Sequence, residues 1–250
     1  MKDVCMLLYN HIVPLNRDNH RNLKIQTGLG TAAFARDTHY APLAGSEFFQ
    51  AARDYPIVFA GEESDELGAV ALLGLRQNEN LFLDDKDAWR EGCYVPAFVR
   101  RYPFVLAQGG KDGDYTVCLD DSFQALSEEE GEPLFDDEGK DTEYLKSVIN
   151  FLNGYRAEID RTRQFTQKLN ELDLLVMREI RVSNREQKHY LLRDLKIVDE
   201  SKLRELDDST LGQLSRDGYL GWIYAHLMSI GNASRFPQYM PQNVGEAEIA

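Results

Sequence analysis

The sequence has few cysteines and lacks the features of an exported or membrane-spanning protein. Cys5, Cys93 and Cys118 stand far apart in a chain of 250 residues, and none forms a CxxC pair. This usage favours reduced thiols in the cytoplasm over a disulfide framework. No apolar run approaches the roughly 18 residues that a membrane helix needs, and we see no signal peptide near the amino terminus. We therefore expect a cytoplasmic protein that does not insert into a membrane.

Recognisable catalytic and metal-binding motifs are also missing. The five histidines show neither HxxxH nor HxH spacing, and the sequence contains no GxSxG elbow, P-loop or HExxH motif. No pair of cysteines has the spacing of a zinc site. We therefore expect no metal ion and no cofactor, and we favour a protein without catalytic activity.

Acidic residues outnumber basic residues, and most of the excess lies in one segment of the chain. The formal net charge is −14, and residues 111–143 hold thirteen acidic against two basic side chains. Nucleic-acid binding needs clustered Lys and Arg, so we expect no nucleic-acid partner. This acidic segment is either a solvated loop or a docking surface for a basic partner or a divalent cation.

Short apolar runs separated by Gly, Asn and Asp predict strands in residues 1–140. The runs are at residues 56–60, 69–75, 81–83, 104–107 and 115–119. The gaps between them are too short for the helical crossovers that parallel strands need, so an antiparallel meander is expected. Short helices are expected beside this sheet, one after Ser46 with Phe48 and Phe49 facing inward, and one starting at Pro96.

Residues 141–236 are predicted to be mostly helical. Apolar residues recur at helical spacing from Leu145 to Ile159, which predicts one long amphipathic helix. Partly alternating residues near 176–198 predict a β-hairpin. The expected fold is α+β, with an antiparallel sheet in the N-terminal half packed with helices, the long helix, and a helical C-terminal region with the hairpin. One compact unit is expected, followed by a flexible tail at residues 237–250.

The most apolar element is the last helix, at residues 219–230. Tyr219, Trp222, Ile223 and His226 fall on one helical face, and apolar residues cover most of the rest. A helix that is apolar nearly all round is buried, either in the core or beneath a partner. This helix and the acidic segment are therefore the candidate surfaces for a protein partner or for a second copy of the chain.

Eight residues are candidates for a binding site. They are Arg100, Arg101, Tyr102, Trp222, Tyr224, His226, Asn232 and Arg235. His226 is either a hydrogen-bonded core histidine or a site residue whose neutral ring acts as base or ligand near pH 7. The adjacent arginines either pair with the acidic segment or bind an anion or carboxylate.

Long segments, in the same order along the chain, point to one known family. They are Tyr55–Phe59, Leu72–Leu75, Glu79–Phe82, Tyr94–Phe104, Gly131–Phe135, Val198–Glu200 and Gly221–Asn232. On these segments the chain resembles the SapC family over residues 20–236. The resemblance implies a bacterial accessory or interaction protein, found near genes for surface-layer proteins, TonB-dependent receptors or tryptophan-halogenase-like flavoproteins. It carries over no catalytic residues.

Two main functions therefore stay open, and a surface-layer component is a weaker third. The first is a non-catalytic accessory protein that binds a protein partner through the last helix or the acidic segment. The second is an enzyme or small-molecule carrier with a pocket around His226, Arg100 and Arg101. Convergence of these residues on a concave, partly apolar pocket would favour the second function. A buried, hydrogen-bonded His226 with no pocket would count against it.

Overall fold

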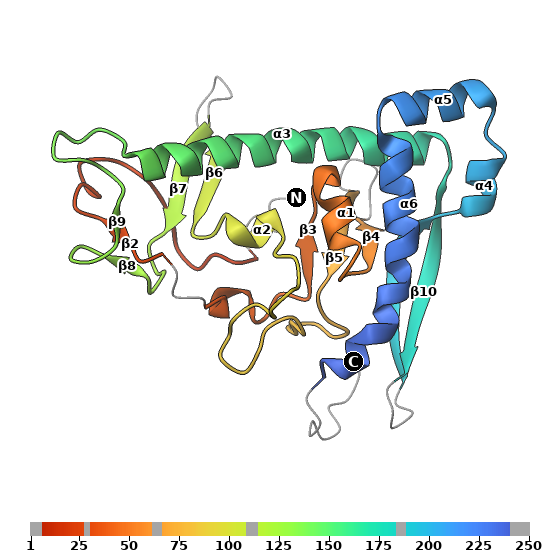
Figure 1. Cartoon of the computed structure of the whole chain (residues 1–250), viewed down its shortest axis with the longest axis horizontal. Coiled ribbons are helices and arrows are strands. Elements are labelled where there is room, and N and C mark those ends of the chain that lie inside the picture. The colour runs from red at the N-terminus through yellow and green to blue at the C-terminus, as the bar shows by residue number, and fades with distance from the viewer. Residues whose placement is uncertain (1–6, 28–30, 62–66, 109–114, 184–188, 241–250) are drawn as a thin grey trace.

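The computed structural model describes residues 7–27, 31–61, 67–108, 115–183 and 189–240. Antiparallel strands, one long helix and a helical C-terminal region confirm the α+β class (Figure 1). The strands are β1 (Ile12–Pro14), β2 (Lys24–Ile25), β3 (Tyr40–Pro42), β4 (Ile57–Ala60), β5 (Gly68–Leu72), β6 (Phe104–Gln108), β7 (Tyr115–Asp120), β8 (Leu126–Ser127), β9 (Glu132–Pro133), β10 (Leu175–Ser183) and β11 (His189–Val198). The helices are η2 (Ala33–Ala35), η3 (Gly45–Glu47), α1 (Phe48–Ala51), α2 (Ala97–Arg100), α3 (Glu143–Glu171), α4 (Glu200–Arg204), α5 (Asp208–Arg216), α6 (Tyr219–Ser229) and η4 (Ile230–Gln238).

The main sheet contains antiparallel strands in the order β10-β11-β4-β5-β3. The central pair is β4 with β5, in which Ala60 lies opposite Gly68. The predicted hairpin forms as β10 and β11, and it joins the sheet where Lys196 lies opposite Phe59. The sheet thus combines strands from the region predicted to be β-rich with strands from the region predicted to be helical.

The core is built around β4 and β5. Ile57, Val58 and Phe59 are fully buried, because both faces of the sheet are covered. Strands of this kind appear in a sequence as continuous apolar runs, which is why these two were recognisable. The run at residues 81–83 does not form the expected strand: Leu81 and Phe82 lie in a turn, and Leu83 makes an isolated β-bridge with Trp89. The Asn80 side chain accepts a hydrogen bond from the Phe82 amide (2.9 Å), which favours the turn.

Two smaller sheets lie at one end of the molecule, with the orders β1-β7-β6 and β8-β2-β9. They surround a second apolar cluster that includes Phe104, Leu119 and Leu134. Figure 1 shows β7, β8 and β9 beneath the first turns of α3. The described part of the acidic segment, residues 115–143, contributes these three strands and therefore belongs to the folded structure.

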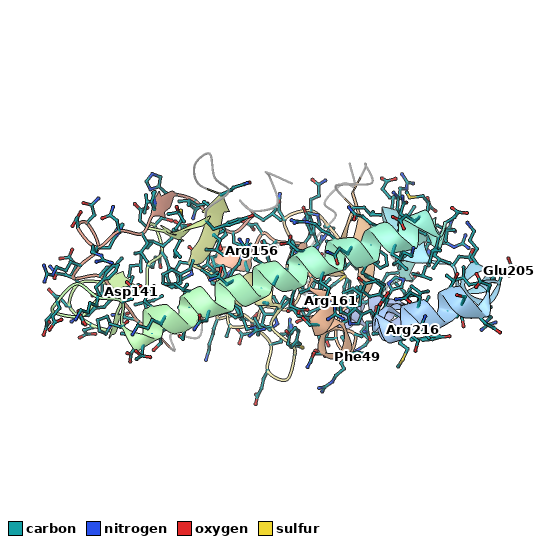
Figure 2. All side chains as sticks on the ribbon, turned by 90° about the horizontal axis from the view of Figure 1, so that it is seen from above. Phe49, Asp141, Arg156, Arg161, Glu205 and Arg216 are labelled. Carbon is teal, nitrogen blue, oxygen red and sulfur yellow. The ribbon has the colours of Figure 1, made fainter. Side chains whose placement is uncertain are left out.

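Helix α3 runs along most of the length of the molecule (Figures 1 and 2). Its 29 residues span about 44 Å at 1.5 Å per residue. Thr142 caps its start by accepting a hydrogen bond from the Leu145 amide (3.2 Å). The helix runs unbroken through Gly154. It therefore provides one long wall that covers both the main sheet and the smaller sheets.

Helix α6 is buried on one side and exposed on the other. Trp222 packs against Phe165 of α3 at a ring-centroid distance of 5.3 Å. On the opposite side, Tyr224 is 47% exposed and Met228 is 80% exposed. The prediction of a buried helix thus holds for one face. Phe49 of α1, predicted to face inward, is 60% exposed.

The chain continues from α6 directly into η4. Tyr239, which ends η4, packs against Phe82 at a centroid distance of 5.3 Å. Residues 241–250 of the predicted tail lie outside the described residues. Across the part of the chain that the structure describes, no helix has the length and apolar character to cross a bilayer.

Candidate functional site

A cavity of about 380 Å³ lies beneath α3. Its walls come from α3, from β3 and β5 of the main sheet, and from the residue that follows α2. The lining is mostly apolar. An engineered cavity of about 150 Å³ can bind benzene, and natural ligand pockets measure roughly 300–1,000 Å³. The space is therefore large enough for a small organic molecule.

The α3 wall follows from helical spacing. Leu152, Tyr155, Ile159, Thr162 and Thr166 all line the cavity. They are three or four residues apart, so they lie on one face of the helix. Along this face the side chains become shorter, from leucine, tyrosine and isoleucine to the two threonines. The shorter side chains leave space between the helix and the sheet.

Part of the sheet wall is made of small residues, beside the larger Tyr40, Pro42 and Val70. Ala60, Gly61, Gly68 and Ala69 line the cavity, and Ala60 pairs with Gly68 across β4 and β5. Protein interiors are normally close-packed. Here, short side chains of the sheet face the threonines of α3, and this combination creates the volume.

Arg101, the residue that follows α2, is a buried charged group of the cavity lining. Its side chain lies among three aromatic rings, and the residue is only 8% exposed. The guanidinium carbon is 4.4 Å from the ring centroid of Phe98, 5.5 Å from that of Tyr155 and 5.6 Å from that of Tyr9. Cation–π contacts of this kind stabilise a desolvated arginine in part.

Some of the hydrogen-bond donors of Arg101 have no acceptor among the residues that the structure describes. Within the described chain, Nε and Nη2 of Arg101 are buried and have no hydrogen-bond partner. A buried donor without an acceptor is costly, and a buried charge more so. Arg101 therefore presents unsatisfied N–H groups in a mainly apolar space.

The threonine hydroxyls of the cavity are already engaged. Thr162 donates to the Glu158 carbonyl (2.6 Å) and accepts from the Gly45 amide (2.8 Å). Thr166 donates to the Thr162 carbonyl (2.9 Å). These bonds fix the α3 wall and its contact with η3.

Two further arginines line the cavity from α3. Arg163 forms an ion pair with Asp160 (2.5 Å). Arg156, labelled in Figure 2, lies over the ring of Tyr115 at the start of β7, with its guanidinium carbon 4.1 Å from the ring centroid. Arg156 is only half-buried. Both therefore differ from Arg101, which is enclosed.

A comparison with family models matches residues 15–236 to SapC. The chain belongs to the SapC family. The matched region contains every residue that lines the cavity. No curated protein and no solved structure matches the chain.

In this SapC-family chain, His226 joins α6 to the main sheet. It is fully buried. Its Nδ1 donates to the carbonyl of Ile57 in β4 (2.7 Å), and its Nε2 accepts from the amide of Val198 in β11 (3.0 Å). These partners assign the neutral tautomer with hydrogen on Nδ1. Ser229 completes the connection by accepting from the Ile57 amide (2.8 Å).

The environment of His226 opposes protonation. Burial lowers the pKa of His226 to about 4, although the hydrogen bond to Ile57 acts in the opposite direction. The ring lies 4.9 Å from Phe59 and does not line the cavity. Both ring nitrogens are used by backbone groups, which leaves neither free to act as a base or a ligand.

The two adjacent arginines of the SapC-family chain point to different places. Arg100 is exposed and donates to the Val95 carbonyl (3.1 Å) and the Tyr94 hydroxyl (3.2 Å). Neither Arg100 nor Arg101 has an ion pair with the described part of the acidic segment. The predicted basic pair is therefore separated, and Arg101 alone reaches the cavity.

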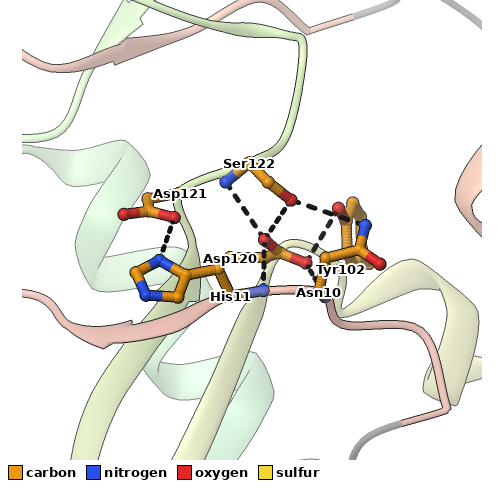
Figure 3. A network of polar contacts seen from close by, with 6 residues as sticks. All are labelled: Asn10, His11, Tyr102, Asp120, Asp121 and Ser122. Carbon is orange, nitrogen blue, oxygen red and sulfur yellow. Dashed lines mark hydrogen bonds and ion pairs between the residues drawn. The ribbon is translucent and has the colours of Figure 1, made fainter.

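Tyr102 belongs to a different environment again. Its ring stacks on Phe34 at a centroid distance of 3.9 Å, and its hydroxyl donates to Asp120 (3.3 Å). Asp120 is fully buried and is the centre of the polar network in Figure 3.

The Asp120 network is saturated. The carboxylate accepts from the amides of Asn10 (2.6 Å) and His11 (3.2 Å), and from both the amide (3.1 Å) and the hydroxyl (2.6 Å) of Ser122. Burial raises the pKa of Asp120, but these hydrogen bonds outweigh burial and bring the pKa below its usual range. Asp120 thus holds the N-terminal segment against β7.

The remaining predicted residues lie at three other places. Trp222 is in the core. Asn232 donates to the carbonyls of Ala52 (2.7 Å) and Tyr55 (3.3 Å) and so ties η4 to the end of α1. Arg235 donates to the Arg53 carbonyl (3.0 Å). Tyr224 lies on the exposed face of α6.

Of the eight predicted residues, Arg101 lines the cavity and the other seven do not. Sequence reasoning missed the small residues of β4 and β5 and the threonines of α3. A signal was present, because Thr162 and Thr166 continue the apolar stripe of the long helix with short side chains. Among the described residues, no group of three His, Cys, Asp or Glu side chains could hold a metal ion.

Proposed function

We propose that this protein binds a small, largely apolar molecule in the cavity beneath α3, as a carrier or accessory protein and not as a catalyst. The observation that carries the proposal is the volume of about 380 Å³ with a mostly apolar lining. Concave, mostly apolar spaces of this size are typical of the ligand sites of proteins.

The walls of the cavity support this proposal. They are formed by α3 and by paired strands, which hold a binding site more rigidly than loops do. The threonine hydroxyls on the α3 wall bond to backbone groups, and the lining of the cavity as a whole is mostly apolar. Apolar burial would therefore provide most of the binding energy.

The proposed setting is the cytoplasm. Cys93 and Cys118 both carry free thiols, and free thiols are the usual state of cysteine in a reducing compartment.

The test uses N-phenyl-1-naphthylamine, a neutral probe whose fluorescence rises in apolar surroundings. We expect saturable binding of one probe per chain. Ile159→Trp should weaken binding strongly, because Ile159 lines the cavity and the larger ring would take up part of its volume. Ile149→Trp is the matched control, since Ile149 is also half-buried on α3 but packs in the second apolar cluster.

The outcome decides the proposal. Strongly weakened binding in Ile159→Trp with retention in Ile149→Trp supports the cavity as the site. Equal binding by both variants, or no saturable binding by the wild-type chain, would contradict it. Circular dichroism of both variants checks that each is folded.

A second candidate function is docking of a protein through the outer face of α6. Phe49, Tyr224 and Met228 are exposed, and the Phe49 ring lies over Gly221, where an added Cβ would be 3.1 Å away. We call Phe49, Gly221, Tyr224 and Met228 the α6 stripe. Contiguous exposed apolar surface commonly marks an interaction site, and aromatic residues and Met are enriched in interfaces.

The partner we propose for the α6 stripe is a second copy of this chain. Twofold homodimers are the commonest oligomers, and in them the same patch meets itself. Light scattering coupled to size-exclusion chromatography should give a dimer for the wild-type chain and a monomer for Met228→Asp. A monomeric wild-type chain at all concentrations would refute this docking mode.

A further inference from the structure

Arg101 is exceptional among the buried charged residues that the structure describes. Glu47, Arg101 and Asp120 are buried. Glu47 accepts hydrogen bonds from the amides of Ala44 (3.0 Å) and Ala97 (2.7 Å) and from the Tyr94 hydroxyl. The carboxylate of Asp120 is also fully hydrogen-bonded. Arg101 is different, because two of its nitrogens are buried without a partner within the described chain.

The aromatic rings around Arg101 do not supply the missing hydrogen-bond acceptors. Rings interact with a guanidinium mainly through its flat face. The N–H donors of arginine lie in the guanidinium plane and form a fork that matches a planar oxyanion. Phe98, Tyr9 and Tyr155 therefore favour the cation without supplying acceptors for Nε and Nη2.

The surroundings of Arg101 select the charge of a ligand. Arginine carries one positive charge at all physiological pH values. A carboxylate brings one negative charge and neutralises it. A phosphate monoester brings roughly −1.5 to −2 at pH 7 and would leave excess charge in an apolar space. Charge balance at this enclosed arginine thus favours a monocarboxylate.

The other arginines of the cavity are less suited to this role. Arg163 is already paired with Asp160. Arg156 is half-buried and lies over the ring of Tyr115. One of its nitrogens lacks a partner within the described chain, but its partial exposure to water lowers the demand for a counter-charge. Arg101 is therefore the expected anchor.

We propose that the ligand of the cavity is an apolar monocarboxylate whose carboxylate pairs with the fork of Arg101 while its aliphatic or aromatic body fills the space beneath α3. This inference rests on the proposed binding function and deepens it by naming the ligand class. The carboxylate would bring an acceptor to Arg101, which lines the cavity, and the body would bury apolar surface against Ile159 and Leu152.

The experiment is displacement of N-phenyl-1-naphthylamine by matched competitors. These are octanoate, octanamide and octyl phosphate, and 1-naphthoate with 1-naphthamide. We expect at least one of the two carboxylates to compete about tenfold or more tightly than its amide, because a charge-assisted bond to a buried arginine is lost in the amide. Octyl phosphate should compete more weakly than octanoate.

Two variants locate the anchor. Arg101→Gln should remove the preference for the carboxylate while the neutral probe still binds. Arg100→Gln is the matched control, since Arg100 is adjacent in sequence but exposed and outside the cavity. It should retain the preference.

The outcomes separate this inference from the proposed function. If the neutral probe binds but carboxylates and amides compete equally, the carboxylate inference fails and the binding function stands. If octyl phosphate competes more tightly than octanoate, the charge argument fails. Retention of the carboxylate preference in Arg101→Gln would also overturn the inference. If the probe does not bind at all, the proposed function itself fails.

Discussion

His226 and Arg101 are both buried side chains that titrate or carry charge, and their surroundings differ. His226 is neutral, and each of its ring nitrogens is bonded to a backbone group of the main sheet. Arg101 is permanently charged, and two of its nitrogens have no partner in the described chain. The first residue closes a contact between elements, whereas the second faces a cavity.

This difference suggests a criterion that distinguishes buried polar groups with a structural role from those with a binding role. A buried group whose hydrogen bonds are all made within the chain stabilises the fold, as at His226 and Asp120. A buried charge without partners lowers stability, and natural proteins tolerate such a loss mainly where a ligand supplies the missing partner. The following predictions test this comparison in order of decreasing effect.

The largest effect is expected for His226→Ala. The change removes the ring that bonds Ile57 and Val198, leaving a buried carbonyl and a buried amide unsatisfied, and it also creates a void. The free energy of unfolding should fall by roughly 3 kcal/mol or more, measured by urea denaturation. His189→Ala, at an exposed position of the β10–β11 hairpin, is the control. A loss below about 1 kcal/mol would show that His226 is not structural.

The second effect is the dependence of stability on pH. Burial lowers the pKa of His226 to about 4 in the folded chain, below the ordinary value near 6.5 of an unfolded chain. Between these two pH values the unfolded chain binds more protons at this histidine than the folded chain does. The contribution of His226 to the free energy of unfolding is therefore highest above about pH 6.5 and falls as the pH drops towards 4. We expect a loss of roughly 2 kcal/mol between pH 7 and pH 4.5.

Variants assign this loss to His226. His226→Gln should show a smaller dependence on pH in this window, because no imidazole is left to protonate at that position. His39→Gln is the comparison, since burial also lowers the pKa of His39, which is only half-buried. If His39→Gln removes more of the dependence than His226→Gln does, the assignment is wrong.

The third effect is stabilisation of the fold by a ligand. A ligand at ten times its dissociation constant raises the free energy of unfolding by about 1.4 kcal/mol. Octanoate or 1-naphthoate at that level should stabilise the wild-type chain and Arg100→Gln by this amount. The same concentration should have little effect on Arg101→Met, and equal stabilisation of all three chains would contradict Arg101 as the anchor. Thermal unfolding measures the difference.

The smallest effect is expected for Arg101→Met without ligand. Methionine fills a similar volume and removes a buried charge that lacks partners, so stability should be unchanged or rise by about 1 kcal/mol. The lost cation–π contacts with Phe98, Tyr155 and Tyr9 offset part of this gain. A loss of about 2 kcal/mol or more would show that Arg101 is structural, like His226.

Much of the local structure was predictable. The stripe from Leu145 to Ile159 indicates α3, and the fully apolar runs indicate β4 and β5. The helical stripe reflects contacts between neighbours along the chain, and the apolar runs reflect burial on both faces of the sheet. The candidate site was predicted only at Arg101. Small residues such as Ala60 and Gly68 give no pattern of their own, and their effect appears only once α3 lies above them.

The sequence by itself determined the α+β class, the long helix and the SapC family, because periodicity and the order of motifs are properties of the linear chain. Only the tertiary structure decided that Arg101 is enclosed while Arg100 is exposed, since successive helical residues point about 100° apart and the packing determines which one faces inward. It also decided the role of His226. The backbone groups that bind its ring lie 28 and 169 residues away in the chain, and no local pattern encodes such a contact.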